Sequence, residues 1–415
     1  MLEASVGRMT KTAIKPVPLG TAIAAVKHIV QATYGSESIA TADAHKRVIA
    51  YDLLAPVDLP LRDSSAVDGY AVRSVDLGQL PAILGIDGEA AAGHPFDGVV
   101  GPGSAVRILT GGAIPRGADR VVMQEHCRLD SGRVVVGETG KRNIRRQGED
   151  VKQGTVVLRA GRRLRVEDLA LAHALGLPTI QVRRQLRVGM LSTGDEVVEP
   201  GSPLGPGQIW DANRSLLKGL LSSLGCQVID LGIVGDHAER IESALRAAAP
   251  DCDLIVTSGG MSVGNGDYMR SIIGRRGHLE VWPLAIKPGK PVGFGDIDDC
   301  PILALPGNSV AAAITFIAFG KPIIDHLAGA TQPASEMLFL PSAFEFTKQK
   351  GVRQFVLAKA SPQASGSQLL AIADQGPAML SALSSTGGII VLEEDREAVM
   401  IGDILAFMPL AAFLN

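Results

Sequence analysis

The chain has 415 residues, of which 46% are hydrophobic and 20% charged, and its formal net charge is −3. This length is too great for a single ordinary core, so we expect several domains. The charge argues against a protein that binds nucleic acid through bulk positive charge, and we expect no nucleic-acid partner.

The cysteine and histidine patterns predict neither a disulfide framework nor a zinc site. The four cysteines are scattered without a C-x-x-C pair, and the eight histidines lack the H-E-x-x-H spacing. The first residues are unlike a signal peptide, and the apolar stretch 310–320 is too short to span a bilayer. We therefore expect a cytoplasmic protein with no membrane partner.

The first half of the chain changes from a helical pattern to a β-rich one. Residues 20–35 place apolar side chains on one helical stripe, with Gly35 as the expected stop. Short β-rich runs then alternate with Gly, Pro and Asp turns, which predicts a small β-rich domain over 55–155. A further strand and helix follow, so residues 15–54 and 156–185 are expected to form a connector domain around this insertion.

The second half alternates strands and helices and then returns to short strands. Over 186–330 the alternation predicts an α/β domain with a parallel sheet covered by helices on both faces. Residues 335–415 read as a small C-terminal β domain of barrel type. The expected fold class is therefore a multi-domain α/β and β protein.

Ligands of open α/β sheets bind beyond the carboxyl ends of the strands, and three segments of the α/β unit end strands in this way. They are LSTGDEVV at 191–198, TSGGMSVGNGDY at 257–268 and LALPGNSVAAA at 303–313. The glycines allow backbone to approach a ligand closely, and the last segment leads into a helix N-terminus that suits an anion.

A pair of lysines adds a second oxyanion-binding feature. Lys287 and Lys290 lie on either side of a Pro-Gly turn, so their ammonium groups can converge on one oxyanion. Carboxylates beside oxyanion-binding loops indicate a bridging Mg²⁺, because this ion shares hard oxygen ligands with substrate phosphates. The pattern lacks a P-loop and a dinucleotide-binding fingerprint. It predicts a phosphorylated ligand, a divalent metal and a second oxyanion.

Structural interpretations of the same residues stay open. Asp236 could cap the following helix, and Asp195 could simply favour a turn after its strand. Lys287 and Lys290 could be solvated surface lysines, and Asn308 is expected to cap the next helix whether or not it contacts a ligand. In the β-rich domain, Asp68 could be a structural turn residue, and Asp150 follows a basic run that is typical of a solvated face.

Nine motifs in a fixed order resemble one family, the molybdopterin molybdenumtransferases, which include the catalytic domain of gephyrin. The matching pieces are SAVDGYAV, RILTGG, GADRVVMQE, NIRRQGEDV, LSTGDE, GQIWDANR, SGGMSVGNGDY, AIKPGKPVGFG and LPGN. The C-terminal domain matches more loosely, through RQFVLA and GGIIVL. The chain departs from the family at Ser309, where a second proline is usual, and at Asn265-Gly266.

The resemblance implies a specific activity. Members insert molybdate into adenylylated molybdopterin with Mg²⁺, cleaving the pyrophosphate linkage to release AMP and the molybdenum cofactor. They are elongated homodimers, with the active cleft between the α/β domain of one subunit and the β domain of the other. A molybdopterin adenylyltransferase acts upstream and molybdoenzymes receive the cofactor downstream.

The resemblance also implies residue roles by motif position. Glu196, Asp236 and Asp267 would be catalytic acids that bind the metal, and Asp68 and Asp150 would reach the cleft from the other subunit. Ser258 and the catalytic lysines Lys287 and Lys290 would hold the molybdate. The implied substrate-binding residues are Thr110, Thr193, Gly194, Ser258, Gly259, Gly260, Ser262, Pro306, Gly307 and Asn308.

Three other functions compete with this interpretation. A molybdopterin adenylyltransferase would lack the β-rich and C-terminal domains. A nucleotide or ADP-ribose pyrophosphatase of the related competence-damage type could use the same loops, with water in place of molybdate. A non-catalytic scaffold that binds the molybdenum cofactor would keep the fold and could lose the acids. The motif acids are all retained here, which favours an enzyme.

Overall fold

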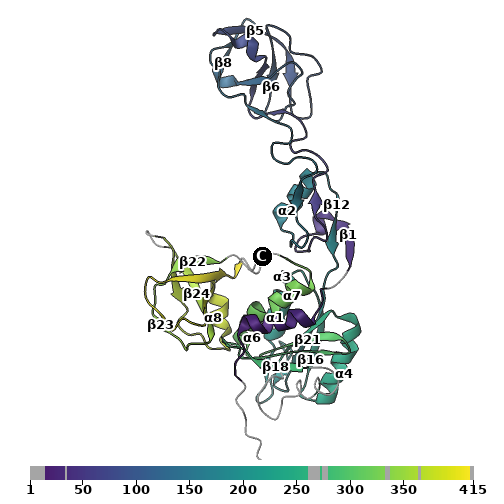
Figure 1. Cartoon of the computed structure of the whole chain (residues 1–415), viewed down its shortest axis with the longest axis vertical. Helices are drawn as coiled ribbons and strands as arrows, with labels where there is room; N and C mark the ends of the chain where they lie inside the picture. The colour runs from purple at the N-terminus through teal and green to yellow at the C-terminus, as the bar shows by residue number, and fades with distance from the viewer. Residues whose placement is uncertain are drawn as a thin grey trace, which may run out of the picture.

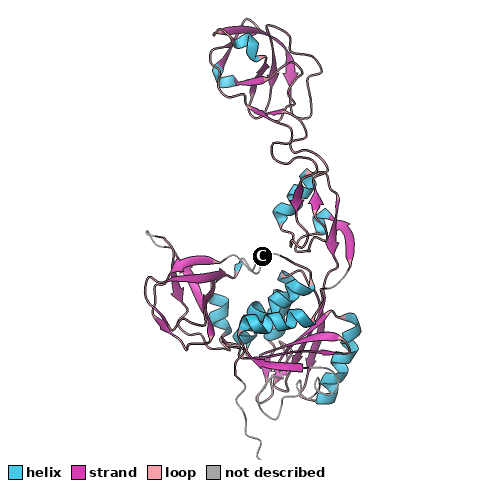
Figure 2. Cartoon of the chain, in the orientation of Figure 1, coloured by secondary structure: helices cyan, strands magenta, loops and turns pink. Residues whose placement is uncertain are grey.

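The structure, a computed structural model, is elongated, with a β-rich part at one end and an α/β part beside a second β part at the other (Figure 1). It describes residues 15–32, 35–259, 272, 279–331, 337–362 and 366–411. Figure 2 shows that strands dominate both β parts, whereas long helices gather around the α/β sheet. This architecture confirms the expected fold class.

The far end of the molecule holds a six-stranded sheet in the order β7-β4-β6-β5-β9-β8. Its strands are β4 (Gly69–Val72), β5 (Ala82–Ala90), β6 (Ser104–Ile108), β7 (Arg120–Met123), β8 (Cys127–Asp130) and β9 (Arg133–Val136). The short helices η2 (Ser74–Leu77) and η3 (Gln124–His126) and the pair β3 (Ser64–Ser65) and β10 (Ile144–Arg145) complete this part.

The middle of the molecule joins two segments that are far apart in the sequence. Strand β1 (Ser36–Ala40) pairs with β12 (Thr179–Arg183), and β2 (Leu53–Leu54) pairs with β11 (Val156–Leu158). Helices η1 (Thr41–Asp43) and α2 (Val166–Ala174) pack with these strands around buried apolar side chains such as Ile49, Leu164 and Val182. The β-rich part is thus attached through both of its ends.

The α/β part is built on a six-stranded sheet in the order β16-β13-β17-β21-β20-β18. Its strands are β13 (Arg187–Thr193), β16 (Gln227–Val234), β17 (Leu254–Ser258), β18 (Leu279–Pro283), β20 (Pro291–Ile297) and β21 (Cys300–Leu305). The first four strands in this order are parallel, as predicted, whereas β20 and β18 are antiparallel, which was not predicted. The tight turn at Asp298 and Asp299 explains the reversal, because their positive φ values of 47° and 64° suit a two-residue hairpin.

Helices cover both faces of this sheet, as expected for its buried parallel strands. One face carries α1 (Leu19–Ile29), α3 (Asn213–Ser223), α6 (Ser309–Thr315), the π-helical stretch Phe316–Gly320 and α7 (Lys321–Leu327). The other face packs against α4 (Ala238–Ala248), which is followed by η4 (Ala249–Asp251). Strand β13 serves both faces, because Met190 and Leu191 point into different apolar clusters.

Two apolar helical segments of this part, α1 and Ser309–Leu327, pack in the core. Helix α1 ends at Ile29, where the N–H of Val30 donates to Val26, so the expected stop at Gly35 is wrong. The stretch Ser309–Leu327 is long and apolar enough to cross a membrane, but 72% of that stretch is buried inside the structure. Packing in the core against α1 and α3 accounts for its composition.

The C-terminal part is a sheet in the order β19-β24-β26-β28-β22, with β25 on β24. Its elements are β22 (Leu338–Pro341), β24 (Arg353–Ser361), β25 (Gln368–Ala371), β26 (Gly388–Leu392), β28 (Ile404–Pro409), the pair β23 (Phe346–Thr347) and β27 (Ala398–Val399), and α8 (Leu380–Ser385). Strand β19 (Ile286–Lys287) comes from the α/β part and runs parallel to β24. One sheet therefore joins the two parts.

The carboxylate of Asp253 ties the start of β17 to the connector. It accepts hydrogen bonds from the Arg184 guanidinium at 2.9 and 2.8 Å and from the backbone N–H of Arg187 at 2.7 Å. We expect Asp253→Ala to lower the free energy of unfolding by about 1–3 kcal/mol, because these donors lose a largely buried partner.

The matched control is Asp130→Ala, which removes an exposed partner 3.7 Å from Arg128. An exposed pair of this kind contributes less than about 1 kcal/mol. Thermal or urea unfolding of both variants measures the difference, and equal losses of stability would contradict the assigned role of Asp253.

Candidate functional site

Four loops meet at the carboxyl edge of the parallel strands. They follow β16, β13, β17 and β21, which are neighbours in the sheet and point the same way. The loops after β16, β13 and β21 carry the predicted residues Asp236, Glu196 and Gly307, and Ser258 is the last residue of β17. Residues that are up to 111 positions apart in the sequence, such as Glu196 and Gly307, therefore converge at one edge of one sheet.

Asp195 and Asp236 hold the first two loops together. The Asp195 carboxylate accepts the backbone N–H of Asp236 at 2.9 Å, and Asp236 accepts the N–H of Asp195 at 3.5 Å. Helix α4 begins at Ala238 with His237 at the N-cap, so the interpretation of Asp236 as a helix cap is wrong. Among the described residues, no hydrogen bond to the second oxygen of either carboxylate is found.

Glu196 folds back over the glycine that precedes it by two positions. A Cβ added at Gly194 would lie 2.4 Å from the Glu196 Oε2 atom, and the φ of Gly194 is +141°. The space left by Gly194 is thus filled by the carboxylate. Glycine is therefore needed at position 194 to make room for the Glu196 carboxylate. The sequence analysis had assigned the glycines of these loops to the close approach of a ligand.

Gly259 is required by a contact between two strand ends. An added Cβ would lie 2.4 Å from the carbonyl oxygen of Thr193, and the φ of Gly259 is +96°. Gly307 lies beside it, since its own Cβ would sit 3.8 Å from the Gly259 Cα. The loops after β13, β17 and β21 are therefore packed backbone against backbone.

Asn213 is a site residue that the sequence analysis missed. Its side-chain amide donates to the Ser258 hydroxyl at 2.7 Å and to the Gly307 carbonyl at 2.6 Å. Ser258 is only 4% exposed. The signal was present in the motif GQIWDANR, but nothing local to that motif indicates which loops it contacts.

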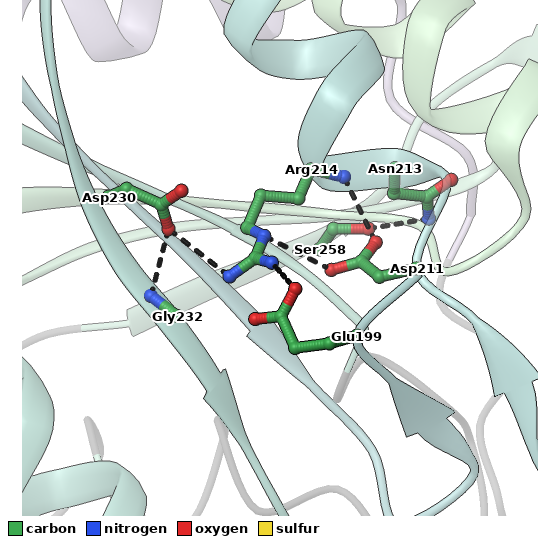
Figure 3. Close-up of polar contacts among 7 residues, drawn as sticks. All are labelled: Glu199, Asp211, Asn213, Arg214, Asp230, Gly232 and Ser258. Carbon is green, nitrogen blue, oxygen red and sulfur yellow. Dashed lines mark hydrogen bonds and ion pairs between the residues drawn. The ribbon is translucent and has the colours of Figure 1, made fainter. Parts of the chain in front are cut away.

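The next residue, Arg214, gathers three carboxylates around one guanidinium (Figure 3). It pairs with Glu199, with Asp230 at 3.3 Å and with the largely buried Asp211 at 3.7 Å. Asp211 also accepts the backbone N–H of Arg214 at 3.0 Å. This cluster fixes the first turn of α3, and through Glu199 it anchors the segment after β14 (Val197–Val198), which pairs with β15 (Ile209–Trp210).

The lysine turn packs on the helix that follows β21. A Cβ at Gly289, whose φ is +104°, would lie 2.1 Å from the Thr315 hydroxyl oxygen. That hydroxyl donates to the Gly289 carbonyl at 3.3 Å. Lys287 and Lys290 are both exposed, as the surface interpretation expected, but they also line a cleft.

The cleft has a volume of about 980 Å³ and lies between the strand-end loops and the C-terminal sheet. Its lining includes seven of the residues singled out from the sequence: Glu196, Gly259, Lys287, Lys290, Pro306, Gly307 and Asn308. The opposite wall comes from the C-terminal part, through residues such as Phe344, Gln354 and Gln375. Asn308 occupies the N-cap position of α6, and no side-chain capping bond is formed there among the described residues.

Asp68, Thr110 and Asp150 are not brought to this cleft within one chain, because they belong to the β-rich part at the other end of the molecule (Figure 1). Asp68 accepts the hydroxyl and the backbone N–H of Thr110, both at 2.7 Å. The hydroxyl hydrogen bond, reinforced by the backbone one, lowers the pKa of Asp68 below its usual value. Asp150 is exposed, and its backbone N–H donates to the carbonyl oxygen of Leu59 at 3.0 Å.

The remaining predicted residues are Thr193, which the structure describes, and several residues after β17, which it does not. Thr193 is buried at the end of β13, and no hydrogen-bond partner of its hydroxyl is found in the part of the chain that the structure describes. Gly260, Ser262 and Asp267, together with Asn265-Gly266, lie outside the described residues. Over the described ranges, no group of three His, Cys, Asp or Glu side chains is placed to hold a metal ion.

The close contact between Gly289 and Thr315 predicts that a side chain at position 289 destabilises the lysine turn. Gly289→Ala should destabilise the protein by about 2–4 kcal/mol, since it combines a strained positive φ with overpacking. Gly402→Ala is the matched control, because its φ is +91° but a Cβ there meets nothing within 4 Å. The melting temperature should fall further for Gly289→Ala, and adding Thr315→Ala should restore part of the loss. Equal shifts for the two glycine variants would contradict this explanation.

Three family models match the chain in order. They are the MoeA N-terminal region (domain I and II) over residues 17–176, a probable molybdopterin binding domain over 189–326 and the MoeA C-terminal region (domain IV) over 340–410. Together they span the connector, the β-rich part, the α/β part and the C-terminal sheet.

Relatives match over nearly the whole length. A molybdopterin molybdenumtransferase of Haemophilus influenzae is 41% identical over 372 residues, covering 88% of this chain and 92% of the relative. Molybdopterin molybdenumtransferase 2 of Mycobacterium tuberculosis is 34% identical over 86% of this chain and 90% of the relative. The crystal structure of a molybdopterin biosynthesis MoeA protein from Pyrococcus horikoshii superposes with a TM-score of 0.80 at 28% identity, covering 95% of this chain and all of that chain. The chain belongs to the molybdopterin molybdenumtransferase (MoeA) family.

Proposed function

We propose that the protein is a molybdopterin molybdenumtransferase of molybdenum cofactor biosynthesis. It inserts molybdate into adenylylated molybdopterin, cleaves the pyrophosphate linkage and releases AMP. The observation that carries this proposal is the single cleft of about 980 Å³ that Glu196, Lys287 and Lys290 line together. Two ammonium groups suit an oxyanion, and a carboxylate beside them suits the metal-bound end of a pyrophosphate.

The chain's own groups divide the work of the reaction. Lys287, Lys290 and the Ser258 hydroxyl hold molybdate. The two ammonium groups offset the repulsion between molybdate and the substrate phosphates, so that a molybdate oxygen can attack. The packed loops of Gly259 and Gly307 present backbone close to the pterin-bearing substrate. Fixing both reactants against a rigid sheet edge reduces the entropy cost of bringing them together, and the lysine charges stabilise the developing oxyanion.

Mg²⁺ is the metal that the donor set fits best. Glu196 and Asp236 offer carboxylate oxygens from neighbouring strand ends, and Asp267 is proposed as the third acid. When bound, Mg²⁺ neutralises phosphate oxygens and orients the linkage that breaks. The reciprocal bonds between Asp195 and Asp236 keep one Asp236 oxygen directed at the backbone, so the other is left for the metal.

The proposed enzyme is a homodimer with a cleft shared between subunits. Asp68, Thr110 and Asp150 lie far from the cleft of their own chain, so their proposed roles require the β-rich part of a second copy (Figure 1). The Thr110 hydrogen bonds favour the ionised form of Asp68, which suits an acid that faces a cationic or metal-bound group.

We also propose the domain bounds, the remaining substrate-binding residues and the cellular location of the protein. The four parts are proposed as domains with bounds 15–54 plus 156–185, 55–155, 186–330 and 335–415. Thr193, Gly194, Gly260, Ser262, Pro306 and Asn308 are proposed to complete the substrate-binding surface. We place the protein in the cytoplasm, where it takes its substrate from a molybdopterin adenylyltransferase and passes the cofactor to molybdoenzymes.

A competence-damage type pyrophosphatase is not favoured, because the matched family models include MoeA regions on both sides of the molybdopterin-binding domain. A scaffold without activity is not favoured either, because the relatives that match over most of the chain are named as transferases.

Removing the charge of Glu196 tests the proposed metal and catalytic role. Glu196→Gln should lower the rate of molybdate-dependent AMP release by at least about 100-fold, since a charged transition-state contact is lost. The exposed Glu239 on α4 offers a matched change, and Glu239→Gln should keep the wild-type rate. AMP quantified by chromatography gives the readout, and full activity of Glu196→Gln would overturn its assignment.

Hybrid dimers test the shared cleft. Asp68→Ala and Glu196→Ala homodimers should each be inactive, and a hybrid purified through two different tags should regain about half of the wild-type activity. One of its two clefts then combines an intact β-rich part with an intact α/β part. If both residues served the cleft of their own chain, the hybrid would have no intact cleft and would stay inactive.

A further inference from the structure

Chemistry alone fixes the orientation of the Asn213 amide. One side-chain atom of Asn213 lies 2.7 Å from the Ser258 Oγ and 2.6 Å from the carbonyl oxygen of Gly307. A carbonyl oxygen can only accept, so this atom must be the NH₂ group. The same NH₂ group then has to donate to the serine oxygen as well, because an amide nitrogen has no lone pair to offer.

This orientation determines what the Ser258 hydroxyl can do. With one lone pair of its oxygen engaged by Asn213, its O–H hydrogen points elsewhere. Asn213 is the hydrogen-bond partner of this hydroxyl among the described residues. Ser258 is 4% exposed and ends β17 beside the strand-end loops, so the hydroxyl hydrogen is directed within a confined, polar edge of the sheet. A donor in that position suits an oxyanion.

The first turn of α3 holds Asn213 firmly. Asp211 accepts the backbone N–H of Arg214 at 3.0 Å, and the Arg214 guanidinium pairs with Glu199, Asp230 and Asp211 on three different segments (Figure 3). The Arg214 side chain is 14% exposed. Asn213 is therefore carried on a turn that is braced from several sides, as a precise hydrogen-bond geometry requires.

We propose that Asn213 is a positioning residue for the oxyanion subsite. Its amide makes the Ser258 hydroxyl an obligate donor toward molybdate and ties that hydroxyl to the Gly307 loop, so that oxyanion and pterin-bearing substrate are held in fixed relation. This inference rests on the proposed function of the cleft. It assigns to Asn213 an effect on molybdate that acts through Ser258 and not through general stability.

Asn213→Asp is the sharpest test, because a carboxylate has the same shape but can only accept. It would draw the Ser258 hydrogen to itself and repel the Gly307 carbonyl. The KM for molybdate should rise about 10- to 100-fold, as expected when a hydrogen bond to a charged group is lost. The KM for adenylylated molybdopterin should change by less than about threefold, so the two constants separate. Asn213→Ala, which adds no charge, should raise the molybdate KM less, by about 3- to 10-fold.

A double-mutant cycle distinguishes positioning from a structural role. Ser258→Ala and the double variant Asn213→Asp/Ser258→Ala should have the same molybdate KM, because Asn213 acts through a hydroxyl that is already gone. Ser215→Asp adds the same charge to an exposed position in the first turn of α3 and should leave the molybdate KM unchanged.

The outcomes separate this inference from the proposed function. Additive effects in the cycle, or equal rises in both KM values for Asn213→Asp, would overturn the role of Asn213 while the transferase assignment stands. AMP release by the wild type that does not depend on molybdate would overturn both. If Asn213→Asp strongly lowers the melting temperature, Asn213→Ala replaces it in the cycle. Ser258→Ala and Asn213→Ala/Ser258→Ala should then have the same molybdate KM, and additive effects would overturn the role of Asn213.

Discussion

The parallel pairing of β13 with β16 and β17, extended by β21, is the constraint on which the site depends. Four strands that run in the same direction must end at the same edge, so the loops that follow them are brought together whatever their separation in the sequence. Helices bury both faces of the sheet and stabilise this arrangement. The loops are then free to carry glycines and carboxylates that contribute little to the core.

Polar side chains convert this shared edge into a defined geometry. Asp195 and Asp236 lock the loops after β13 and β16, and Asn213 links those after β17 and β21. On the far side of the cleft, β19 pairs with β24, so the backbone position of Lys287 depends on the C-terminal sheet. Lys287 and the acidic loops thus belong to different sheets, and their spacing is set by the contact between the two parts.

Much of this could be predicted from the sequence, because local patterns encode it. The apolar runs that end in LSTGDE, TSGG and LPGN are strands with loops at their carboxyl ends, and the structure brings those loops together. The antiparallel extension β20-β18, the pairing of Lys287 with the C-terminal sheet and the role of Asn213 were missed. Each depends on contacts between distant segments, and no local periodicity records which segments those are. Asp236 shows the converse, since a good capping pattern was overridden by its contact with Asp195.

A molybdenumtransferase differs from a pyrophosphatase in that its release of AMP requires molybdate. Wild-type protein supplied with adenylylated molybdopterin and Mg²⁺, with and without molybdate, distinguishes the two activities. We expect AMP to be released only when molybdate is present, and the rate to saturate with molybdate concentration. Release of AMP at the same rate without molybdate would contradict this expectation and would identify the protein as a pyrophosphatase.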